Sequence, residues 1–181
     1  MLRLKEKYNK IAGKLKKDQK LGSIMEVPRI NKIVVNTGIG SFRDNRESVE
    51  SFEKEFSEIL GQKPYPRKAR ISVAGFKIKQ GDLVGFTGTL RGDRMWAFLD
   101  KLIGTAIPRI RDFRGLENDK FDQDGNYSLG IKEHVIFPEI NPNAVKGIRS
   151  LQITIVSTSK NKKLNKLVLE NLGMPFKKED L

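Results

Sequence analysis

The chain of 181 residues carries 35 Lys and Arg against 22 Asp and Glu, which gives a formal net charge of +13 at pH 7. It has no cysteine and a single histidine, His134, so a disulfide scaffold, a thiolate zinc site and a cysteine nucleophile are excluded. The sequence offers no apolar window of the roughly 18 residues that a membrane span needs, and its beginning lacks the apolar core of a secretory signal. A chain of this length fits one domain, and its excess positive charge favours a polyanionic partner, most commonly nucleic acid.

No internal repeat, low-complexity tract or shift in composition marks a linker, so we expect a single domain over residues 1–181. The expected elements, in chain order, are a basic amphipathic helix over 2–20, a strand over 29–36, a helix from Val49 to Ile59 with Gly61 as its C-cap, strands over 70–74 and 83–91 around a basic loop, a helix after an Asp93 N-cap, strands over 127–137 and 151–157, and a helix from Ser159 to Leu172 that ends at Gly173. Because tight alternation of strands and helices is absent, we expect an α+β fold with a mostly antiparallel sheet. Helices should cover one face of the sheet and a basic loop should protrude, which leaves the other face or an edge free for a ligand.

The strand over 83–91 allows a local test, because neighbouring strand residues point to opposite faces. Thr89 and Arg91 lie on the polar side, where a hydroxyl and a guanidinium could meet phosphate or 2′-hydroxyl groups. An exposed strand face with no ligand explains the same two residues equally well. The side expected to face the core presents Val84, Phe86, Gly88 and Leu90.

Positive charge is segregated along the sequence. Residues 1–21 hold eight Lys and Arg, and residues 59–81 hold six with no acidic residue, whereas residues 44–58 are acidic. A surface that needed only solubility would mix its signs. Because six cations without a carboxylate repel one another unless an anion is near, the basic stretch 59–81 indicates a nucleic-acid contact, without choosing between RNA and DNA.

Several short motifs have a structural explanation that is better than the catalytic one. Gly38 and Gly40 lack the third glycine of a dinucleotide fingerprint, and we expect a tight turn with positive φ there. The stretch 122–126 is too short for a calcium loop and predicts a turn. Glu133 and His134 are neighbours on a predicted strand, so their side chains should not converge. We therefore expect no enzyme, no metal, no cofactor and no small-molecule substrate; a nucleic-acid-stimulated enzyme is the rival hypothesis.

The predicted helix over 2–20 allows a second rival function. Its lysines surround an apolar stripe, so it could lie on an anionic membrane. The stripe lacks Trp and Phe, and the rest of the chain needs a cover for its core. We therefore expect the helix to pack on its own domain, with no membrane partner.

Seven segments of the sequence resemble one known family when taken in order. These are VPRI at 27–30, NTGIG at 36–40, GQKP at 61–64, KARISVAGFKIKQG at 68–81, TLRGDRMW at 89–96, PRIRDFRGL at 108–116, and 121–140 with its GNYSLGIKE and IFPEI. They resemble the fifth protein of the large ribosomal subunit in its bacterial form, the universal 5S rRNA-binding family. The resemblance implies an α+β fold, a cytoplasmic, ribosome-bound location, and attachment of 5S rRNA in the central protuberance. The implied partners are 5S rRNA, 23S rRNA, P-site tRNA, neighbouring 5S-binding ribosomal proteins and the small subunit's thirteenth protein.

The resemblance also implies site residues. For 5S rRNA these are the polar residues Asn36, Gln62 and Thr89, and the phosphate partners Lys63, Lys68, Arg70 and Arg91. For the elbow of P-site tRNA the implied residues belong to the loop 72–81, namely Ser72, Gly75, Phe76, Lys77, Lys79 and Gln80. For the intersubunit bridge they are Arg109, Arg111 and Arg114, with parts of 137–145. At Gly88 the family usually has a β-branched residue, so an irregular strand is expected beside Thr89.

Overall fold

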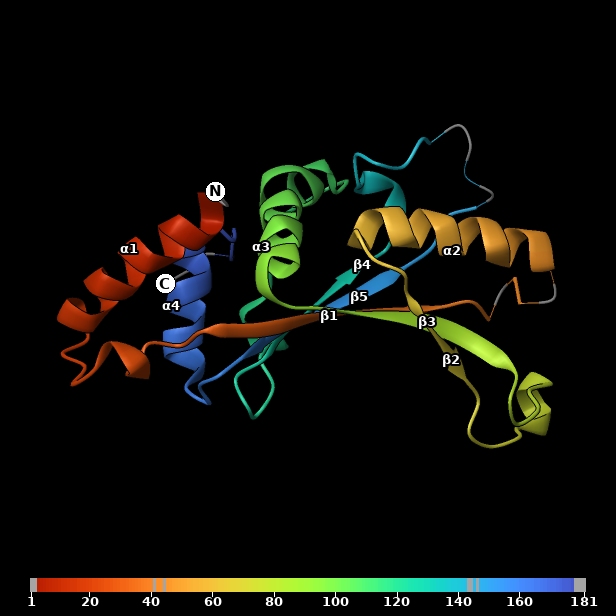
Figure 1. Ribbon diagram of the computed structural model, residues 1–181, viewed down its shortest axis with the longest axis horizontal. Coiled ribbons are helices and arrows are strands. Elements are labelled where there is room, and N and C mark those ends of the chain that lie inside the picture. Colours follow the sequence, from red (N-terminus) through yellow and green to blue (C-terminus); the bar gives the residue numbers. More distant parts are fainter. Residues whose placement is uncertain (1–2, 41, 44, 143–144, 146, 178–181) are drawn as a thin grey trace.

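A computed structural model describes residues 3–40, 42–43, 45–142, 145 and 147–177. Its five strands form one sheet in the order β2-β3-β1-β5-β4, and every neighbouring pair is antiparallel. This confirms the predicted α+β class (Figure 1). The helices and strands are α1 (Arg3–Asp18), β1 (Ile30–Gly38), α2 (Arg46–Leu60), β2 (Tyr65–Lys68), β3 (Leu83–Leu90), α3 (Gly92–Lys101), β4 (Tyr127–Ile131), β5 (Leu151–Ser157) and α4 (Lys162–Leu172).

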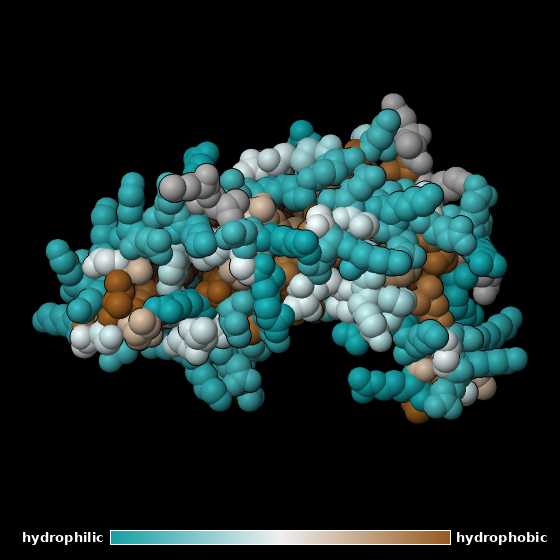
Figure 2. All heavy atoms as spheres, in the orientation of Figure 1, coloured by the Kyte–Doolittle hydropathy of each residue, from teal (hydrophilic) through white to brown (hydrophobic). Residues whose placement is uncertain are grey.

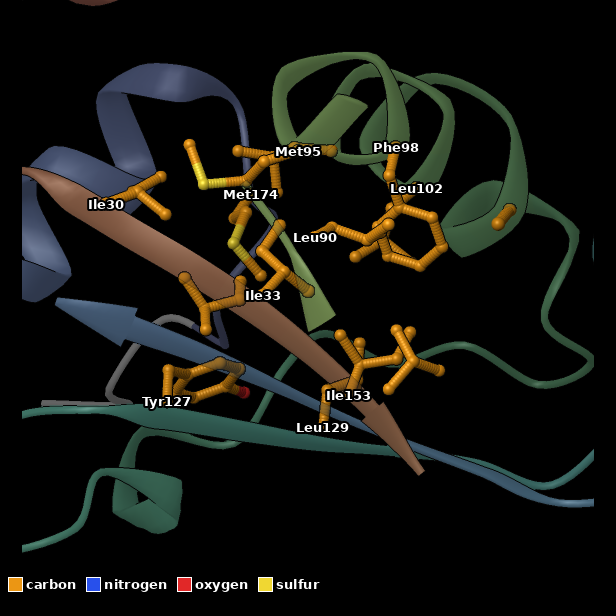
Figure 3. Packing of buried hydrophobic residues seen from close by; sticks show 14 of the residues in the cluster. Ile30, Ile33, Leu90, Met95, Phe98, Leu102, Tyr127, Leu129, Ile153 and Met174 are labelled. Atoms are coloured by element: carbon orange, nitrogen blue, oxygen red, sulfur yellow. The ribbon is translucent and has the colours of Figure 1, made fainter. Parts of the chain in front are cut away.

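The helices occupy one side of the sheet. Figure 1 shows α2 and α3 above the strands, with α1 and α4 side by side at one end. Strand alternation supplies the apolar layer between them, because Ile33 and Val35 of β1 and Ile153 of β5 are fully buried. Leu90 of β3 and Phe98 of α3 join this layer, as Figure 3 shows for the central part of the core. The opposite face of the sheet is covered by none of the four α-helices.

The basic N-terminal helix packs on the protein itself. Its apolar residues Leu4, Tyr8, Ile11 and Leu15 are buried, and it contacts α4 and α3. The ring of Tyr8 lies 5.5 Å from that of Trp96. The stripe that could have faced a lipid surface is therefore part of the core, as expected. Leu2, the first residue of the predicted helix, lies outside the described residues. None of the described helices is long and apolar enough to cross a membrane.

Helix ends follow the sequence signals in part. Gly61 caps α2 with φ of 67°, as predicted. The N-cap of α4 is Asn161 rather than Ser159, because the Asn161 side chain accepts the amides of two first-turn residues. Asp93 does not cap α3, which begins at Gly92; its carboxylate lies 3.0 Å from Lys5 Nζ. The Asp93 side chain thus joins α3 to α1 and does not cap α3.

Two strand predictions were wrong. The strand expected over 70–74 is displaced to Tyr65–Lys68, which pairs with β3. Pro66 is tolerated there because β2 is an edge strand and needs hydrogen bonds on one side only. The strand expected over 127–137 ends at Ile131, and the chain then forms a short 3-10 turn over His134–Ile136.

The positive φ predicted for Gly38 and Gly40 is absent. Gly38 ends β1 opposite Gly85, and neither Gly38 nor Gly40 has positive φ. A β-carbon on Gly85, by contrast, would overlap the Thr37 carbonyl, so the close approach of β1 and β3 requires a glycine at position 85. β3 pairs with β1 in unbroken register through Gly88, and a β-carbon on Gly88 would overlap the Leu60 side chain.

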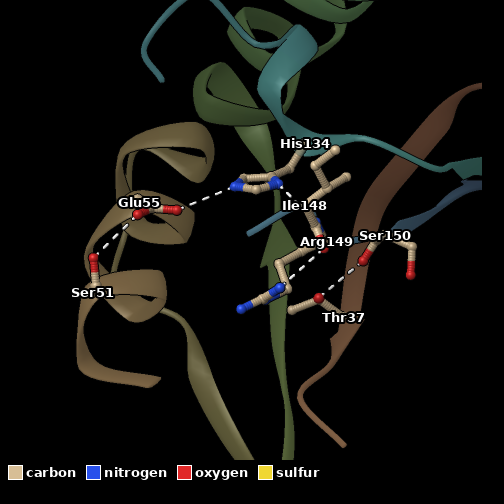
Figure 4. A network of polar contacts seen from close by, with 7 residues as sticks. All are labelled: Thr37, Ser51, Glu55, His134, Ile148, Arg149 and Ser150. Carbon is tan, nitrogen blue, oxygen red and sulfur yellow. Dashed lines mark hydrogen bonds and ion pairs between the residues drawn. The ribbon is translucent and has the colours of Figure 1, made fainter. Parts of the chain in front are cut away.

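The single histidine belongs to a structural network (Figure 4). His134 is fully buried, and its Nε2 lies 3.1 Å from Glu55 Oε2 on α2. Its Nδ1 accepts the Arg149 backbone amide at 3.1 Å. Nδ1 is therefore the acceptor and Nε2 carries the proton toward Glu55. The partner of His134 is Glu55 rather than its sequence neighbour Glu133, and the two bonds of His134 link α2 to Arg149 in the chain before β5.

Candidate nucleic-acid interface

The helix-free face of the sheet is a polar surface. In the strand register, Asn36 of β1 stands opposite Thr87 of β3 on one side and Gln152 of β5 on the other. Because residues opposite each other point to the same face, these side chains form one row across the sheet. Thr89 lies two positions from Thr87 and shares that face. The alternation predicted for residues 83–91 holds in part: Phe86 and Leu90 are buried and Thr89 and Arg91 are exposed, but Thr87, on the predicted polar side, is buried.

The three polar residues implied by the resemblance come together from separate segments. The Gln62 side chain, just after α2, donates through Nε2 to the Thr89 carbonyl at 3.0 Å. Thr87 donates from its hydroxyl to Asn36 Oδ1 at 2.6 Å, which leaves the Asn36 amide NH₂ available for a ligand. Thr87 itself is only 4% exposed and orients Asn36 from the neighbouring strand. The arrangement presents the Asn36 amide donor and the Thr89 hydroxyl on one face of the sheet.

Cations surround this part of the sheet. Lys63, Lys68, Arg70 and Arg91 are all exposed, and among the described residues none of them lies within ion-pair distance of a carboxylate. Lys63 follows Gln62, Lys68 ends β2, and Arg91 directly follows β3. Arg70 lies beyond the sheet, in the β2–β3 loop. Within the part of the chain that the structure describes, this positive charge is not paired with a carboxylate, so it can attract an anion.

The β2–β3 connection spans 69–82 and extends from the end of the sheet (Figure 1). It is longer than the predicted loop 72–81 because the strand before it ends at Lys68. Hydrogen bonds within the loop hold its shape: the Val73 amide donates to the Ile78 carbonyl at 2.9 Å, and the Gln80 amide donates to the Ser72 hydroxyl at 2.9 Å. Lys77 adopts the left-handed conformation with φ of 52°.

The tip of this loop is exposed. Phe76 is 76% exposed, which is unusual for a large apolar side chain and offers a contact surface to a partner. The predicted contact residues of the loop share one property, which is that all are exposed: Ser72, Gly75, Phe76, Lys77, Lys79 and Gln80. They lie together on the protrusion and apart from Asn36 and Thr89 on the sheet.

The third predicted group lies elsewhere. Arg109, Arg111 and Arg114 are exposed in the segment that begins at the end of a short 3-10 helix, Ile107–Arg109, some residues after α3. Arg111 and Arg114 line a cleft of about 610 Å³ between this segment and the edge strand β4. The structure brings them together with β4 and not with the Asn36–Thr89 surface. Residues 143–144, which fall within the predicted stretch 137–145, lie outside the described residues.

Sequence reasoning missed part of the polar face. Gln152 and Thr154 of β5 share the face of Asn36, and the Ser128 hydroxyl of β4 lies 3.2 Å from that of Thr154. The sequence does indicate that Gln152 and Thr154 share one strand face, because they alternate with Leu151, Ile153 and Ile155. Strand order was needed to place them beside Asn36. Within the described ranges, no group of three or more metal-ligating side chains was found.

Comparisons with known proteins agree with this architecture. The family model described as "Ribosomal protein L5" matches residues 23–79, and a second model, which describes the C-terminus of the same ribosomal family, matches residues 83–176. A "Large ribosomal subunit protein uL5" of Geotalea uraniireducens is 47% identical over 98% of this chain and 99% of its own length. Relatives with the same description from Ruminiclostridium cellulolyticum and Spiroplasma kunkelii are each 48% identical over 97% of this chain and 98% of their own. The matched family consists of structural ribosomal proteins and not of enzymes. The chain therefore belongs to the L5 family of large ribosomal subunit proteins.

Proposed function

We propose that this protein binds 5S rRNA through the helix-free face of its sheet and attaches that RNA to the large subunit, in the central protuberance. Family membership places the protein on the ribosome, in the cytoplasm, as a structural component. The observation that carries the finer proposal is the convergence of Asn36, Gln62 and Thr89 from three chain segments, with Gln62 bonded to Thr89 at 3.0 Å. No catalytic step is involved.

The proposed recognition has two physical parts. The amide of Asn36 and the hydroxyl of Thr89 bond to RNA groups such as 2′-hydroxyls, which distinguish RNA from DNA. Lys63, Lys68 and Arg91 displace counterions from phosphates and supply affinity that depends on salt. Because the Asn36 side chain is already bonded to Thr87, it loses less conformational entropy when RNA binds.

A filter-binding titration of isolated 5S rRNA across salt concentrations tests this proposal. Asn36→Ala and Thr89→Ala should each weaken binding by roughly 1–3 kcal/mol, because each leaves an RNA polar group unpaired. Asn171→Ala, on the exposed side of α4, is the matched control. Losses no larger than that of the control would refute the assigned residues, and affinity that does not change with salt would refute the electrostatic part.

We further propose that the loop 72–81 contacts the elbow of P-site tRNA. Its cations Lys77 and Lys79 are exposed on the protrusion beside Phe76, at a distance from the sheet face. Combined Lys77→Ala and Lys79→Ala should spare the binding of isolated 5S rRNA and weaken tRNA binding to reconstituted ribosomes. A double variant that fails to bind isolated 5S rRNA would contradict this division of roles.

The remaining contacts follow from family resemblance. We propose that Arg109, Arg111 and Arg114 meet the small subunit's thirteenth protein in an intersubunit bridge, and that 23S rRNA and neighbouring 5S-binding proteins complete the surroundings. The exposure of all three arginines within one short segment, residues 109–114, supports this proposal. Replacing the three with alanine should weaken subunit association measured by sedimentation, while 5S rRNA binding is retained. Unchanged association would overturn the bridge assignment.

A further inference from the structure

Strand β4 forms one edge of the described sheet, where β5 is its neighbour. Tyr127 and Leu129 of β4 pack in the core with Ile153 of β5 (Figure 3). In an antiparallel pair, successive residues alternately bond to the partner strand and direct their backbone groups away from it. An edge strand therefore leaves every second residue with an N–H and a C=O that can pair with another chain.

Two hydrogen bonds at the start of β4 fix this alternation. The Ser157 amide of β5 donates to the Asn126 side chain at 3.2 Å, so the Ser157 backbone points toward β4. By alternation Ile155 also points toward β4, where it stands opposite Tyr127. Asn126 accepts the Asp122 amide through its backbone carbonyl at 3.0 Å, so β5 does not use this carbonyl. Both bonds assign Tyr127 to the β5 side and its neighbours in β4 to the outer side.

Gly130 is the centre of the free edge. Leu129 and Ile131 have the phase that faces β5, and they stand opposite Ile153 and Leu151. Gly130 lies between them and therefore directs its N–H and C=O away from β5. Among the described residues, neither group hydrogen-bonds to another backbone group. Because Gly130 is exposed and a β-carbon on it would meet no atom within 4 Å, a donor and an acceptor stand open at this edge.

The two edges of the sheet differ in their protection. Natural edge strands avoid pairing with other chains by means of prolines and charged residues. The opposite edge, β2, has both, since Pro66, Arg67 and Lys68 are three of its four residues. β4 consists of Tyr, Ser, Leu, Gly and Ile and contains neither. On the surface that Figure 2 shows in colour, apolar atoms form only small, separate areas, so no broad apolar patch there competes with β4 as a docking site.

The cleft of about 610 Å³ runs along this free edge. Gly130 lines it on one side and residues 110–117 line it on the other. Part of its wall is apolar, because Ile110 and Phe113 are only partly buried and line it together with Ile136. The volume lies in the range of sites that hold a ligand. A row of open backbone groups beside an apolar wall suits an extended peptide, which bonds through its main chain and places alternate side chains in the cleft.

The charge of the cleft selects the kind of peptide. Five Lys or Arg and three Asp or Glu line it, and one of these acids, Glu117, is paired with Lys120 at 3.2 Å. The four other cations have no described carboxylate within ion-pair distance: Arg111, Arg114, Lys132 and Lys177. This excess favours a segment with acidic side chains. It disfavours a second copy of this chain, because pairing of β4 with β4 would bring the same cations together.

We propose that β4 accepts an extended, acidic segment of a neighbouring protein, which joins the sheet as a sixth strand. Its apolar residues enter the apolar part of the cleft, and its acidic residues alternate with them and meet the unpaired cations. The inference goes beyond the proposed function, because none of the proposed RNA or bridge contacts uses the backbone of β4. Arg111 and Arg114 belong both to this cleft and to the proposed bridge, so the test leaves them unchanged.

The full-length variants Gly130→Pro and Gly130→Ala form a matched pair. Both place side-chain carbon in open space, but only proline removes the outward N–H, and an edge strand tolerates this loss. The probe is an eight-residue peptide in which Val alternates with Glu, acetylated and amidated at its ends and labelled for fluorescence anisotropy. A peptide that alternates Val with Lys is the charge control. Circular dichroism and urea unfolding verify that each variant is folded, and exchange of the wild-type Gly130 amide, followed by NMR, gives a readout that needs no variant.

We expect the Val–Glu peptide to bind the wild type and Gly130→Ala alike, and to bind Gly130→Pro about tenfold more weakly. The Val–Lys peptide should bind the wild type about tenfold more weakly than the Val–Glu peptide does. The Gly130 amide should exchange more slowly when the Val–Glu peptide is bound. Equal affinity of all three proteins for that peptide, or unchanged exchange of the Gly130 amide at saturation, would overturn the inference.

Two further measurements separate the other occupants of this edge. Isolated 5S rRNA should bind Gly130→Pro and Gly130→Ala equally, because the two proteins differ at the outward N–H. A loss of RNA affinity in the proline variant alone would assign the edge to RNA and overturn the protein partner. Sedimentation should show no self-association that depends on Gly130, and a dimer that Gly130→Pro abolishes would assign the edge to a second copy instead. Either result would leave the proposed binding of 5S rRNA through Asn36 and Thr89 intact.

Discussion

Gly88 allows a quantitative test of how α2 packs on the sheet, on the face opposite the proposed RNA surface. It belongs to β3 and faces the helices, where an added β-carbon would overlap Leu60 Cδ1 and lie 3.1 Å from Cδ2. Leu60 is only 3% exposed, so its side chain has little room to move. Gly88→Val should therefore overpack the core and cost about 1–3 kcal/mol of unfolding free energy. Leu60→Ala alone should cost about 2–5 kcal/mol through the cavity that it leaves.

The double variant carries the decisive prediction. Leu60→Ala removes as many side-chain carbons as Gly88→Val adds, and the two sites are in contact, so the combined change conserves core volume. The pair should lie within about 1.5 kcal/mol of the wild type, well short of the sum of the single losses. Urea unfolding followed by circular dichroism measures all four proteins. If the losses add, the two side chains do not share one space and this description of the packing is wrong. Because Gly88 faces away from Thr89, the folded double variant should also keep its affinity for 5S rRNA.

Three further changes have defined outcomes. Burial, together with nearby carboxylates, raises the pKa of Tyr127 to about 12 from its ordinary 10.0, so the unfolded chain loses this proton first. Stability should then fall by about 2 kcal/mol as the pH rises from 10 to 12, and Tyr127→Phe should lack that part of the fall in urea titrations; identical pH profiles would contradict this. Asn165 is buried and donates to two backbone carbonyls at 2.8 and 2.7 Å, so Asn165→Ala should cost about 2–3 kcal/mol in the same assay, whereas the exposed Asn171→Ala should change stability by less than about 0.5 kcal/mol. Ser72→Ala removes the acceptor of the Gln80 amide, so that amide should exchange with deuterium faster while 5S rRNA affinity stays constant; unchanged exchange would mean that the bond does not hold the loop.

The fold was predictable wherever one periodicity dominated. Helical spacing of buried residues located α1, α2 and α4, and a left-handed glycine ended α2 and α4 as expected. Strand ends were less predictable, because they depend on pairing partners that are distant in sequence. The strand expected over 70–74 failed for this reason: Tyr65–Lys68 finds its partner in β3, whereas Ile71, although β-branched, is left 72% exposed in the loop.

The site was predictable to the extent that it lies on one strand. Alternation along β3 placed Thr89 and Arg91 outward before any partner strand was known. Gln62 follows a helix, where no periodicity reports its direction, and its position came from the family resemblance alone. Gln152 lies 116 residues after Asn36 in the chain and becomes its neighbour only through the order of the strands. A local pattern can state which face a residue occupies but not which residues share that face.

Crosslinking tests the central claim most directly, because it asks which RNA the protein meets and through which face. The intact protein is crosslinked in cell extract by ultraviolet light, and the attached RNA and peptides are then sequenced. We predict 5S rRNA joined to peptides of β1 and β3 that contain Asn36 or Thr89. Recovery of 5S rRNA mainly on peptides of α2 or α4, or its absence from the crosslinked RNA, would contradict the account.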